Sequence, residues 1–290
     1  MPRPLNEYSL RQWRLLHPLS ERYEHARYRL RSAALLRRKA LAGDVPAVLR
    51  AIAGRRVLVT VAFNEPEMVD WQLRLAKLFL SDTVHLIADN TGDAGRTAAV
   101  EEAARRGGAL YLRLPEAPWR GLEAGRNHGL AMDWLWRHIL RPARPAMFGF
   151  IDHDLYPLRP TDPFAPLKDY PVAGRVKGLP HRWYLWAGFC FFRFDAVCDV
   201  GLDFGLDWAA GLDTGGGNWW RLYRRLDPGR VAQPDYRLEA IIPGVAAEES
   251  GIERLGDWLH ETHHRNRNWD LQKEKHRRVG QILAPLLSRC

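Results

Sequence analysis

Four short apolar runs, separated by segments with helical spacing, occupy the chain between residues 57 and 151. The runs are Val57–Ala62, Val84–Ala88, Leu110–Leu114 and Met147–Ile151. The first run is continuous and rich in β-branched residues, which is typical of a strand buried on both faces. The segments between the runs, 67–80, 95–106 and 122–140, have the composition and spacing of helices. Strands and helices that alternate in this way predict an α/β fold with a parallel sheet and helices on both faces.

The sequence on either side of these runs has a different character. Residues 9–42 have helical spacing, and Ser9 with Gln12 suggests a capping box at the start. Beyond residue 155, Pro, Gly and Trp become frequent, and short strands are expected at 170–175, 187–194 and 240–245. These changes predict four regions: a basic helical extension (1–54), an α/β half (55–160), a second, mixed half (161–264) and a basic C-terminal helix (265–290).

The formal net charge of +9 is unevenly distributed along the chain. Residues 1–56 hold 13 Lys and Arg against 4 Asp and Glu, and residues 264–290 hold 7 against 2. The middle of the chain is therefore mildly acidic, which argues against a protein that binds nucleic acid over its whole surface. The basic N-terminal helix fits either a solvated helix packed on the body or a surface helix attracted to anionic lipid.

The cysteines and the apolar runs indicate a cellular location. Cys190, Cys198 and Cys290 form no CxxC pair, which argues against a disulfide framework or a thiolate zinc site and fits a reducing cytosol. The N-terminus lacks the apolar centre of a signal peptide, and no run reaches the ~18 apolar residues that span a bilayer. We therefore expect a cytoplasmic protein, with peripheral attachment to the inner face of the membrane through the basic N-terminus as an option.

The strongest chemical signal is Asp152-His153-Asp154, which follows the fourth run. In an extended chain, residues i and i+2 point the same way, so both carboxylates can face one cation. Oxygen ligands of this kind suit Mg²⁺ or Mn²⁺ carrying a diphosphate. The alternative is a turn of solvated aspartates at a strand end. Because the pair closes the fourth strand of a parallel series, we favour the metal site.

Other polar residues follow the neighbouring runs and are expected at the same edge of the sheet. Asn64 follows the first run and Asp89 follows the second, while Arg126 and Asn127 lie near the start of the third helix. Arg126 could pair with a phosphate. Each of the others has a structural alternative: Asn64 can cap a helix, Asp89 can form a turn, and Asn127 can sit on a core-facing helix surface.

The order of these motifs resembles the nucleotide-sugar half of the GT-A-fold glycosyltransferases, especially the large inverting family numbered two. The similar stretches, over residues 55–160, are Val57–Ala62, Asn64-Glu65, Asp89–Asp93, Gly125–Gly129 and Asp152–Asp154. The resemblance implies a Rossmann-type αβα sandwich with a central, mostly parallel sheet and a smaller, mixed acceptor-side half. It places Ala62, Asn64 and Glu65 near the nucleotide and Asp89 at the base. It places Asp152 and Asp154 at ribose, metal and diphosphate.

The second half lacks the Gln-x-x-Arg-Trp motif of processive polysaccharide synthases, but two other groups of residues could supply acceptor-side chemistry. In 211–220, glycines allow a ligand to approach the backbone, and Asp213 could deprotonate an acceptor hydroxyl unless it only forms a turn. In 258–266, His260 and His263 could complete the metal shell from one helix turn, unless they belong to a polar surface cluster.

The sequence therefore predicts an enzyme that moves a sugar from a UDP- or GDP-linked donor to a hydroxyl of a carbohydrate or glycolipid. Mn²⁺ or Mg²⁺ would be its cofactor. A nucleotidyltransferase is one alternative, but it should carry a Gly-rich loop with a basic residue where this chain has Phe63-Asn64-Glu65-Pro66. A non-enzymatic protein that binds membranes or nucleic acid is the other, and it leaves the Asp152–Asp154 pair unexplained. We expect no nucleic-acid partner.

Overall fold

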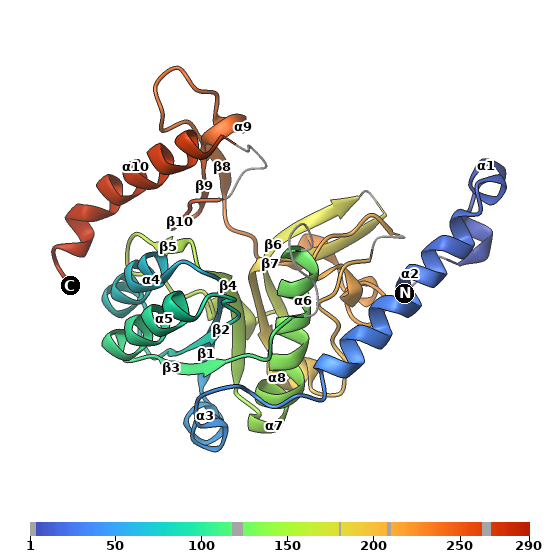
Figure 1. Ribbon diagram of the computed structural model, residues 1–290, viewed down its shortest axis with the longest axis horizontal. Coiled ribbons are helices and arrows are strands. Elements are labelled where there is room, and N and C mark those ends of the chain that lie inside the picture. The colour runs from blue at the N-terminus through green and yellow to red at the C-terminus, as the bar shows by residue number, and fades with distance from the viewer. Residues whose placement is uncertain (1–3, 118–123, 180, 208–209, 263–267) are drawn as a thin grey trace.

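The computed structural model describes residues 4–117, 124–179, 181–207, 210–262 and 268–290 (Figure 1). In this part of the chain, the larger sheet has the strand order β3-β2-β1-β4-β7-β6. Its parallel strands are β1 (Arg56–Ala62), β2 (Val84–Asp89), β3 (Leu110–Arg113) and β4 (Met147–Asp152). The four apolar runs are thus confirmed as neighbouring parallel strands.

An antiparallel hairpin extends this sheet beyond β4, and a smaller sheet lies beside it. The hairpin consists of β6 (Val172–Leu179) and β7 (Arg182–Arg193), and β7 pairs with β4. The smaller sheet has the order β5-β10-β9-β8 and is antiparallel throughout. Its strands are β5 (Leu155–Pro157), β8 (Tyr236–Glu239), β9 (Ile252–Leu255) and β10 (Trp258–His260).

Helices cover both faces of the larger sheet, as the continuous apolar strands require. Val57, Val59 and Val61 of β1 face a core that includes α3 (Val45–Ile52) and α6 (Ala124–Leu135). Leu58 and Ala62 point the other way, toward α4 (Pro66–Phe79) and α5 (Ala94–Gly107). Because side chains alternate along a strand, a strand covered on both sides has no polar face.

The three helices expected between the strands are confirmed, with one irregularity. The third, α6, continues through a π-helical turn (Trp136–Leu140) into α7 (Arg141–Ala143). Two shorter helices, α8 (Phe194–Val197) and α9 (Ala247–Ser250), lie in the second half. Among the described residues, no helix combines the length and the apolar character that crossing a bilayer requires.

The N-terminal helix differs from its expected extent. The interruption that Pro18 predicts is confirmed, because the helix is split into α1 (Leu10–Arg14) and α2 (His17–Leu35). Leu16 between them has a left-handed φ of 54°. The Ser9–Gln12 capping box is confirmed. The extension of the helix to residue 42 is wrong, because Leu41 donates a backbone hydrogen bond to the Arg113 carbonyl. This segment is therefore held along β3 instead of continuing the helix.

The strands expected in the second half are partly confirmed. Segments 170–175 and 187–194 overlap the longer strands β6 and β7, whereas the strand at 240–245 is wrong. Ile241 and Ile242 gave that segment its apolar character, but they lie beside α10 (Trp269–Leu287), whose Arg278 donates to the Ile241 carbonyl. The three-to-four-residue strands β5, β9 and β10 were not anticipated.

The helix α4 lies between the two sheets. Its Met68 and Leu75 belong to a buried cluster that includes Leu259 of β10 and Val279 and Leu283 of α10. The C-terminal helix expected within 265–290 is seen as α10, at the end of the molecule away from α1 (Figure 1). The limits of the four regions remain predictions.

One buried side chain of α4 joins the larger sheet to the turn that starts the smaller one. Gln72 accepts a hydrogen bond from Thr60 Oγ1 (2.6 Å) and donates to the carbonyl oxygens of Asp152 (2.7 Å) and Leu155 (2.8 Å). It is 1% exposed. A single amide thereby fixes both ends of the turn that contains Asp154.

Replacement of Gln72 by Leu should lower the melting temperature, because it leaves a hydroxyl and two carbonyls without this partner. Each buried group that loses its hydrogen bond costs ~1–3 kcal/mol. Calorimetry would compare the melting temperature of Gln72→Leu with that of Gln281→Leu, a control at an exposed position on α10. Equal melting temperatures would show that Gln72 does not hold the turn.

Candidate metal and nucleotide site

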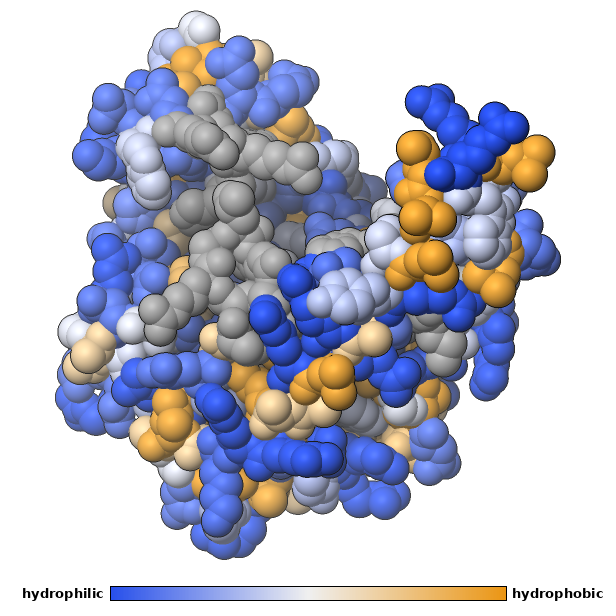
Figure 2. Space-filling model, turned by 45° about the vertical axis from the view of Figure 1, so that its right-hand side comes forward, coloured by the Kyte–Doolittle hydropathy of each residue, from blue (hydrophilic) through white to orange (hydrophobic). Residues whose placement is uncertain are grey.

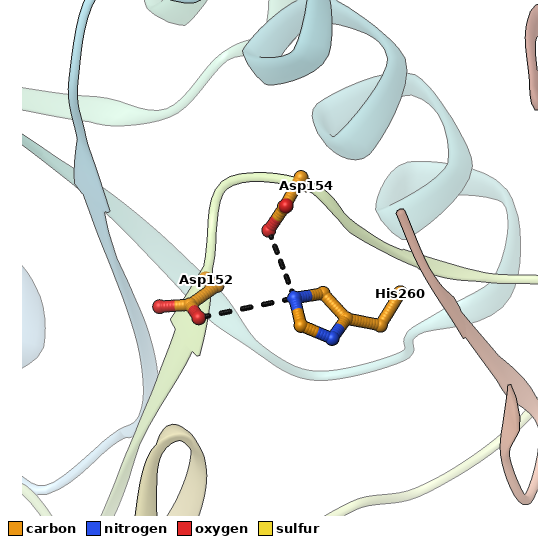
Figure 3. A group of neighbouring side chains, drawn as sticks. All are labelled: Asp152, Asp154 and His260. Atoms are coloured by element: carbon orange, nitrogen blue, oxygen red, sulfur yellow. Dashed lines mark ion pairs between the residues drawn. The ribbon is translucent and has the colours of Figure 1, made fainter. Parts of the chain in front are cut away.

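Three potential ligands converge at the carboxyl end of β4 (Figure 3). Asp152 ends β4, Asp154 lies in the turn before β5, and His260 ends β10. His260 Nε2 lies 3.3 Å from Asp154 Oδ1 and 3.9 Å from Asp152 Oδ2. One donor atom from each residue lies within 4.8 Å of the other two. We call these three residues the candidate metal site.

Two local details differ from the sequence argument. The carboxylates converge because residues 153 and 154 form a turn, not because the chain stays extended. The expectation that His260 and His263 project from one helix turn is wrong, because His260 lies on a strand and pairs with Leu155 of β5. His263 lies outside the described residues.

The ring of His260 is fixed by its other nitrogen. Nδ1 lies 2.8 Å from Glu253 Oε2, and Arg175 pairs with the same oxygen at 2.6 Å. Burial acts to raise the pKa of Glu253, but hydrogen bonds from His260 and Arg175 lower it to about 2. Glu253 is therefore a carboxylate that accepts from Nδ1–H, which directs Nε2 toward Asp152 and Asp154.

The donor set fits a divalent cation. Metal-binding histidines usually donate their second N–H to a carboxylate or a carbonyl, which fixes the ring, and Glu253 provides this partner. Burial acts to lower the pKa of His260, but Asp154, Glu253 and Asp152 together raise it to about 9. Two carboxylates with one imidazole offer mainly hard oxygen ligands, which suit Mg²⁺ or Mn²⁺.

The backbone around the carboxylates leaves little spare room. A Cβ added at Gly188 of β7 would lie 2.3 Å from Asp152 Oδ2 and 2.3 Å from the Trp186 ring. The absence of a side chain at Gly188 therefore lets the Asp152 carboxylate and the indole share this space. Trp186 in turn lies against His260, with 4.7 Å between the ring centroids.

The C-terminal helix holds the segment that follows His260. The backbone N–H of Glu261 donates to the Asp154 carbonyl (2.9 Å), and buried Lys275 of α10 donates to the Thr262 carbonyl. His276 Nδ1 lies 3.0 Å from Glu261 Oε1, and its ring stacks on Trp71 of α4. These contacts fix the end of β10 and so the position of His260.

At the end of β1, the loop before α4 is held by its own neighbours. Asn64 has a φ of 59°, its N–H donates to Thr91 Oγ1 (3.1 Å), and its carbonyl accepts from Arg96 (2.6 Å). Glu65 pairs with Arg96 at 3.5 Å. The alternative in which Asn64 caps the helix is wrong, because Glu65 occupies the N-cap position and makes no capping bond. Ala62, the last residue of β1, is fully buried.

Asp89 is engaged inside the protein. It is 0% exposed, Oδ1 accepts from the N–H of Thr91 (2.8 Å), and Oδ2 accepts from the Tyr111 hydroxyl (2.8 Å). It thus shapes the turn after β2, as the structural alternative supposed. Contact with a nucleobase stays a prediction for this residue.

The start of α6 directs its polar residues to different places. The Arg126 guanidinium lies 5.9 Å from the ring centroid of Tyr28 on α2, and Arg126 is 5% exposed. Asn127 lines a small cavity with Asn90 and Leu114. His128 faces the candidate metal site, with Nε2 3.8 Å from Asp152 Oδ1. Successive α-helical residues are 100° apart, so His128 and Arg126 point to nearly opposite sides.

The loop that carries Asp213 lies beside the start of α6. Asp213 is exposed, its Oδ1 accepts from the N–H of Thr214 (2.7 Å), and a Cβ at Gly125 would lie 3.5 Å from that oxygen. Lys177 of β6 connects this region with the metal site, since its Nζ lies 4.7 Å from the Trp186 ring centroid. Burial lowers the pKa of Lys177, while the charges of Glu253, Asp213 and Asp152 act in the opposite direction.

Sequence reasoning did not assign several of these neighbours to the site. They are His128, Lys177 and Glu253. His128 had a usable signal in the sequence, because it is adjacent to Asn127, which the sequence selects. Lys177 and Glu253 had none, because they come from strands whose pairing the sequence did not reveal.

No protein-family model and no curated protein matches this chain. Among solved structures, it is similar to S. aureus TarS (14% identity, 52% of this chain and 30% of that chain, TM-score 0.37). It is also similar to the mannosyltransferase PcManGT from Pyrobaculum calidifontis in complex with GDP-Man and Mn²⁺ (17% identity, 64% of this chain and 59% of that chain, TM-score 0.36). A third similar structure is glucosyl-3-phosphoglycerate synthase from Mycobacterium tuberculosis in complex with Mn²⁺, UDP and glucosyl-3-phosphoglycerate (20% identity, 87% of this chain and 86% of that chain, TM-score 0.43).

The chain spans 30% to 59% of the length of the first two of these structures.

Replacement of Asp154 by Asn should abolish Mn²⁺ binding and keep the fold. The change preserves volume but removes the charge of a ligand that is 6% exposed, and the loss should exceed the ~10–100-fold typical of outer-shell changes. Without metal, the variant should be at least as stable as the wild type, because one of two facing carboxylates is gone. Calorimetric Mn²⁺ titration of Asp154→Asn, with His153→Ala as control, measures this; wild-type affinity in Asp154→Asn would contradict the site.

Replacement of Glu253 by Gln should weaken Mn²⁺ binding although Glu253 is not a ligand. The neutral amide orients the His260 ring less strongly, and such changes lower metal affinity ~10–100-fold. Glu239→Gln is the matched control, because Glu239 pairs with Arg254 on the same small sheet. Titration of both folded variants with Mn²⁺ should separate them, and equal affinities would show that Glu253 does not orient the ligand.

Proposed function

We propose that this chain is a metal-dependent glycosyltransferase of the GT-A type. It would move a sugar from a UDP- or GDP-linked donor to a hydroxyl of a carbohydrate or glycolipid. The observation that carries the proposal is the convergence of Asp152, Asp154 and His260 at the carboxyl end of a parallel strand. This edge of an open α/β sheet is where such folds bind ligands.

Each residue of the site has a role in this proposal. Asp152, Asp154 and His260 would hold Mn²⁺ or Mg²⁺, which when bound neutralises charge on the departing diphosphate. Lys177, which lies over the Trp186 ring and interacts electrostatically with Asp152, would add a positive charge near the diphosphate. Asp213 would accept the proton of the acceptor hydroxyl, since its exposed carboxylate lies on a loop that acceptors can reach.

The nucleotide would lie along the ends of β1 and β2, against the residues that the sequence selected there. The sequence selected Ala62, Asn64, Glu65 and Asp89 at these strand ends, and Arg126 and Asn127 at the start of α6. Asn64 offers the clearest support, because its Oδ1 is buried and has no hydrogen-bond partner among the described residues. A buried acceptor without a partner is costly, and a ligand N–H would satisfy it.

The two alternatives explain the site less well. A nucleotidyltransferase should place a basic residue in a Gly-rich loop after the first strand, but β1 leads through Phe63 and Asn64 directly into α4. A non-enzymatic binding protein gives no reason to place two carboxylates and an imidazole together in a largely buried position. A bound cation would give the two facing carboxylates a common partner.

We further propose that the chain acts in the cytoplasm and can meet the inner face of a membrane, where a glycolipid acceptor would be presented. The basic composition of residues 1–56 supports this. We expect no nucleic-acid partner, because the body between the basic ends is mildly acidic.

Thermal shift with UDP, GDP and CDP, each with and without Mn²⁺, tests the donor class. A ligand that binds only the folded state raises its stability by ~2.7 kcal/mol at a concentration of 100 Kd. Stabilisation by a nucleoside diphosphate only when Mn²⁺ is present supports the proposal. No response to any of the three would contradict it, and mass spectrometry of hydrolysed nucleotide-sugars then identifies the sugar.

Replacement of Asp213 by Asn should lower kcat strongly and leave Mn²⁺-dependent nucleotide binding nearly unchanged. A general base contributes typically ~10²–10⁴-fold to the rate. Asp199→Asn, at an exposed position on another loop, is the control. Near-normal turnover by Asp213→Asn would show that Asp213 is not the general base, and Glu248 and Glu249 would be the next residues to test.

A further inference from the structure

The N-terminal arm, which we define as α1 and α2 (residues 10–35), projects from the body (Figure 1). Figure 2 shows hydrophobic and hydrophilic side chains beside each other on this projecting part. Many large apolar side chains of the arm are exposed, up to 81% for Leu10 and 75% for Leu30. The others are Trp13, Leu15, Leu16, Leu19 and Tyr23. This is an unusual concentration, because the rest of the described chain exposes few large apolar residues.

The exposed apolar residues of α2 form one stripe. At 100° per residue, Leu19, Tyr23 and Leu30 lie within ~40° of each other around the helix axis. Exposed Ala26 and Ala33 fall in the same sector. The buried residues of α2, including Ser32 and Leu35, lie on the opposite side and pack on the body. The stripe is therefore a second apolar face that no described residue covers.

The charges of α2 are arranged around this stripe. Exposed Arg22 and Arg29 lie ~60–80° from it on the helical wheel. The acidic residues lie toward the opposite side and are already engaged. Glu21 accepts from the Tyr8 hydroxyl (2.6 Å), and Glu24 pairs with Arg27 (3.3 Å). The outward face of α2 thus carries apolar and positively charged side chains and no carboxylate.

The tip of the arm also exposes large apolar side chains. Leu15 and Leu16 join α1 to α2 through the left-handed conformation of Leu16, and both are exposed. Trp13 lies one helical turn before them and is 39% exposed. Trp and Leu beside Arg are typical of helices that lie in the boundary between lipid headgroups and acyl chains.

We propose that the outward face of the N-terminal arm is a docking surface for an anionic lipid membrane. Charge complementarity selects this occupant, because the face offers arginines to lipid phosphates and has no carboxylate to repel them. The apolar stripe would enter the boundary region while Arg22 and Arg29 contact headgroups. This inference concerns binding alone and does not depend on the proposed transferase activity.

Co-sedimentation of the full-length protein with vesicles tests the proposal. One set contains phosphatidylcholine alone, and the other contains equal parts of phosphatidylcholine and phosphatidylglycerol. We expect binding to the anionic set only, and a decline as added salt screens the charges. Two double variants separate the apolar from the electrostatic contribution to binding. Leu19→Ser with Leu30→Ser removes the apolar contacts, and Arg22→Glu with Arg29→Glu reverses the charges. Each should weaken partitioning at least ~10-fold.

Matched controls are Leu41→Ser, which changes a 53% exposed leucine outside the arm, and Arg141→Glu, at an exposed position on α7. Both should bind vesicles like the wild type, and all variants should keep Mn²⁺-dependent nucleotide binding, which reports separately on the proposed function. Equal binding to both vesicle sets, or wild-type binding by the arm variants, overturns the proposal. A dimer in light scattering that the leucine variants dissociate would also overturn it, by identifying a second copy as the occupant.

Discussion

The short ladder between β5 and β10 places an imidazole beside two carboxylates. Its register sets His260 opposite Leu155, one residue after Asp154, although more than one hundred residues separate them along the chain. Such a short antiparallel pair has little stability of its own. It persists because Leu259 and Tyr156 are buried in the cluster that α4 and α10 share. The position of the His260 ring therefore depends on hydrophobic packing behind the strand.

The charges that meet at this place alternate in sign. Asp154 faces His260, His260 contacts Glu253, and Glu253 pairs with Arg175. Burial of an isolated carboxylate is costly, but a chain of hydrogen-bonded partners of opposite charge offsets much of this cost. Each member also restrains the next, so the ligand atoms are held in place before a cation binds. Such preorganisation is what an electrostatic binding site requires.

The turn between β4 and β5 receives support from both sides. Gln72 of α4 fixes its backbone, and Gly188 of β7 leaves space for the Asp152 carboxylate. The arm and the site meet through α6, which carries Arg126 against Tyr28 and His128 toward Asp152. One helix thus touches both the base of the projecting arm and the edge of the candidate metal site.

The sequence by itself determined the parallel part of the sheet and the two carboxylates of the candidate metal site. Strands such as Val57–Ala62 are encoded locally, because a run buried on both faces must be continuously apolar, and Asp152 and Asp154 follow such a strand directly. The sequence did not reveal β9 and β10, because strands of three or four residues are too short to show a regular alternation of apolar and polar side chains. Glu253 on β9 carried no signal for the same reason, and Lys177 carried none because the sequence did not reveal how β6 pairs. The sequence offered His260 as a further ligand, but its place on β10 and its contact with Glu253 were decided only by the tertiary structure. Pairing between distant short strands depends on the packing of α4 and α10 around them.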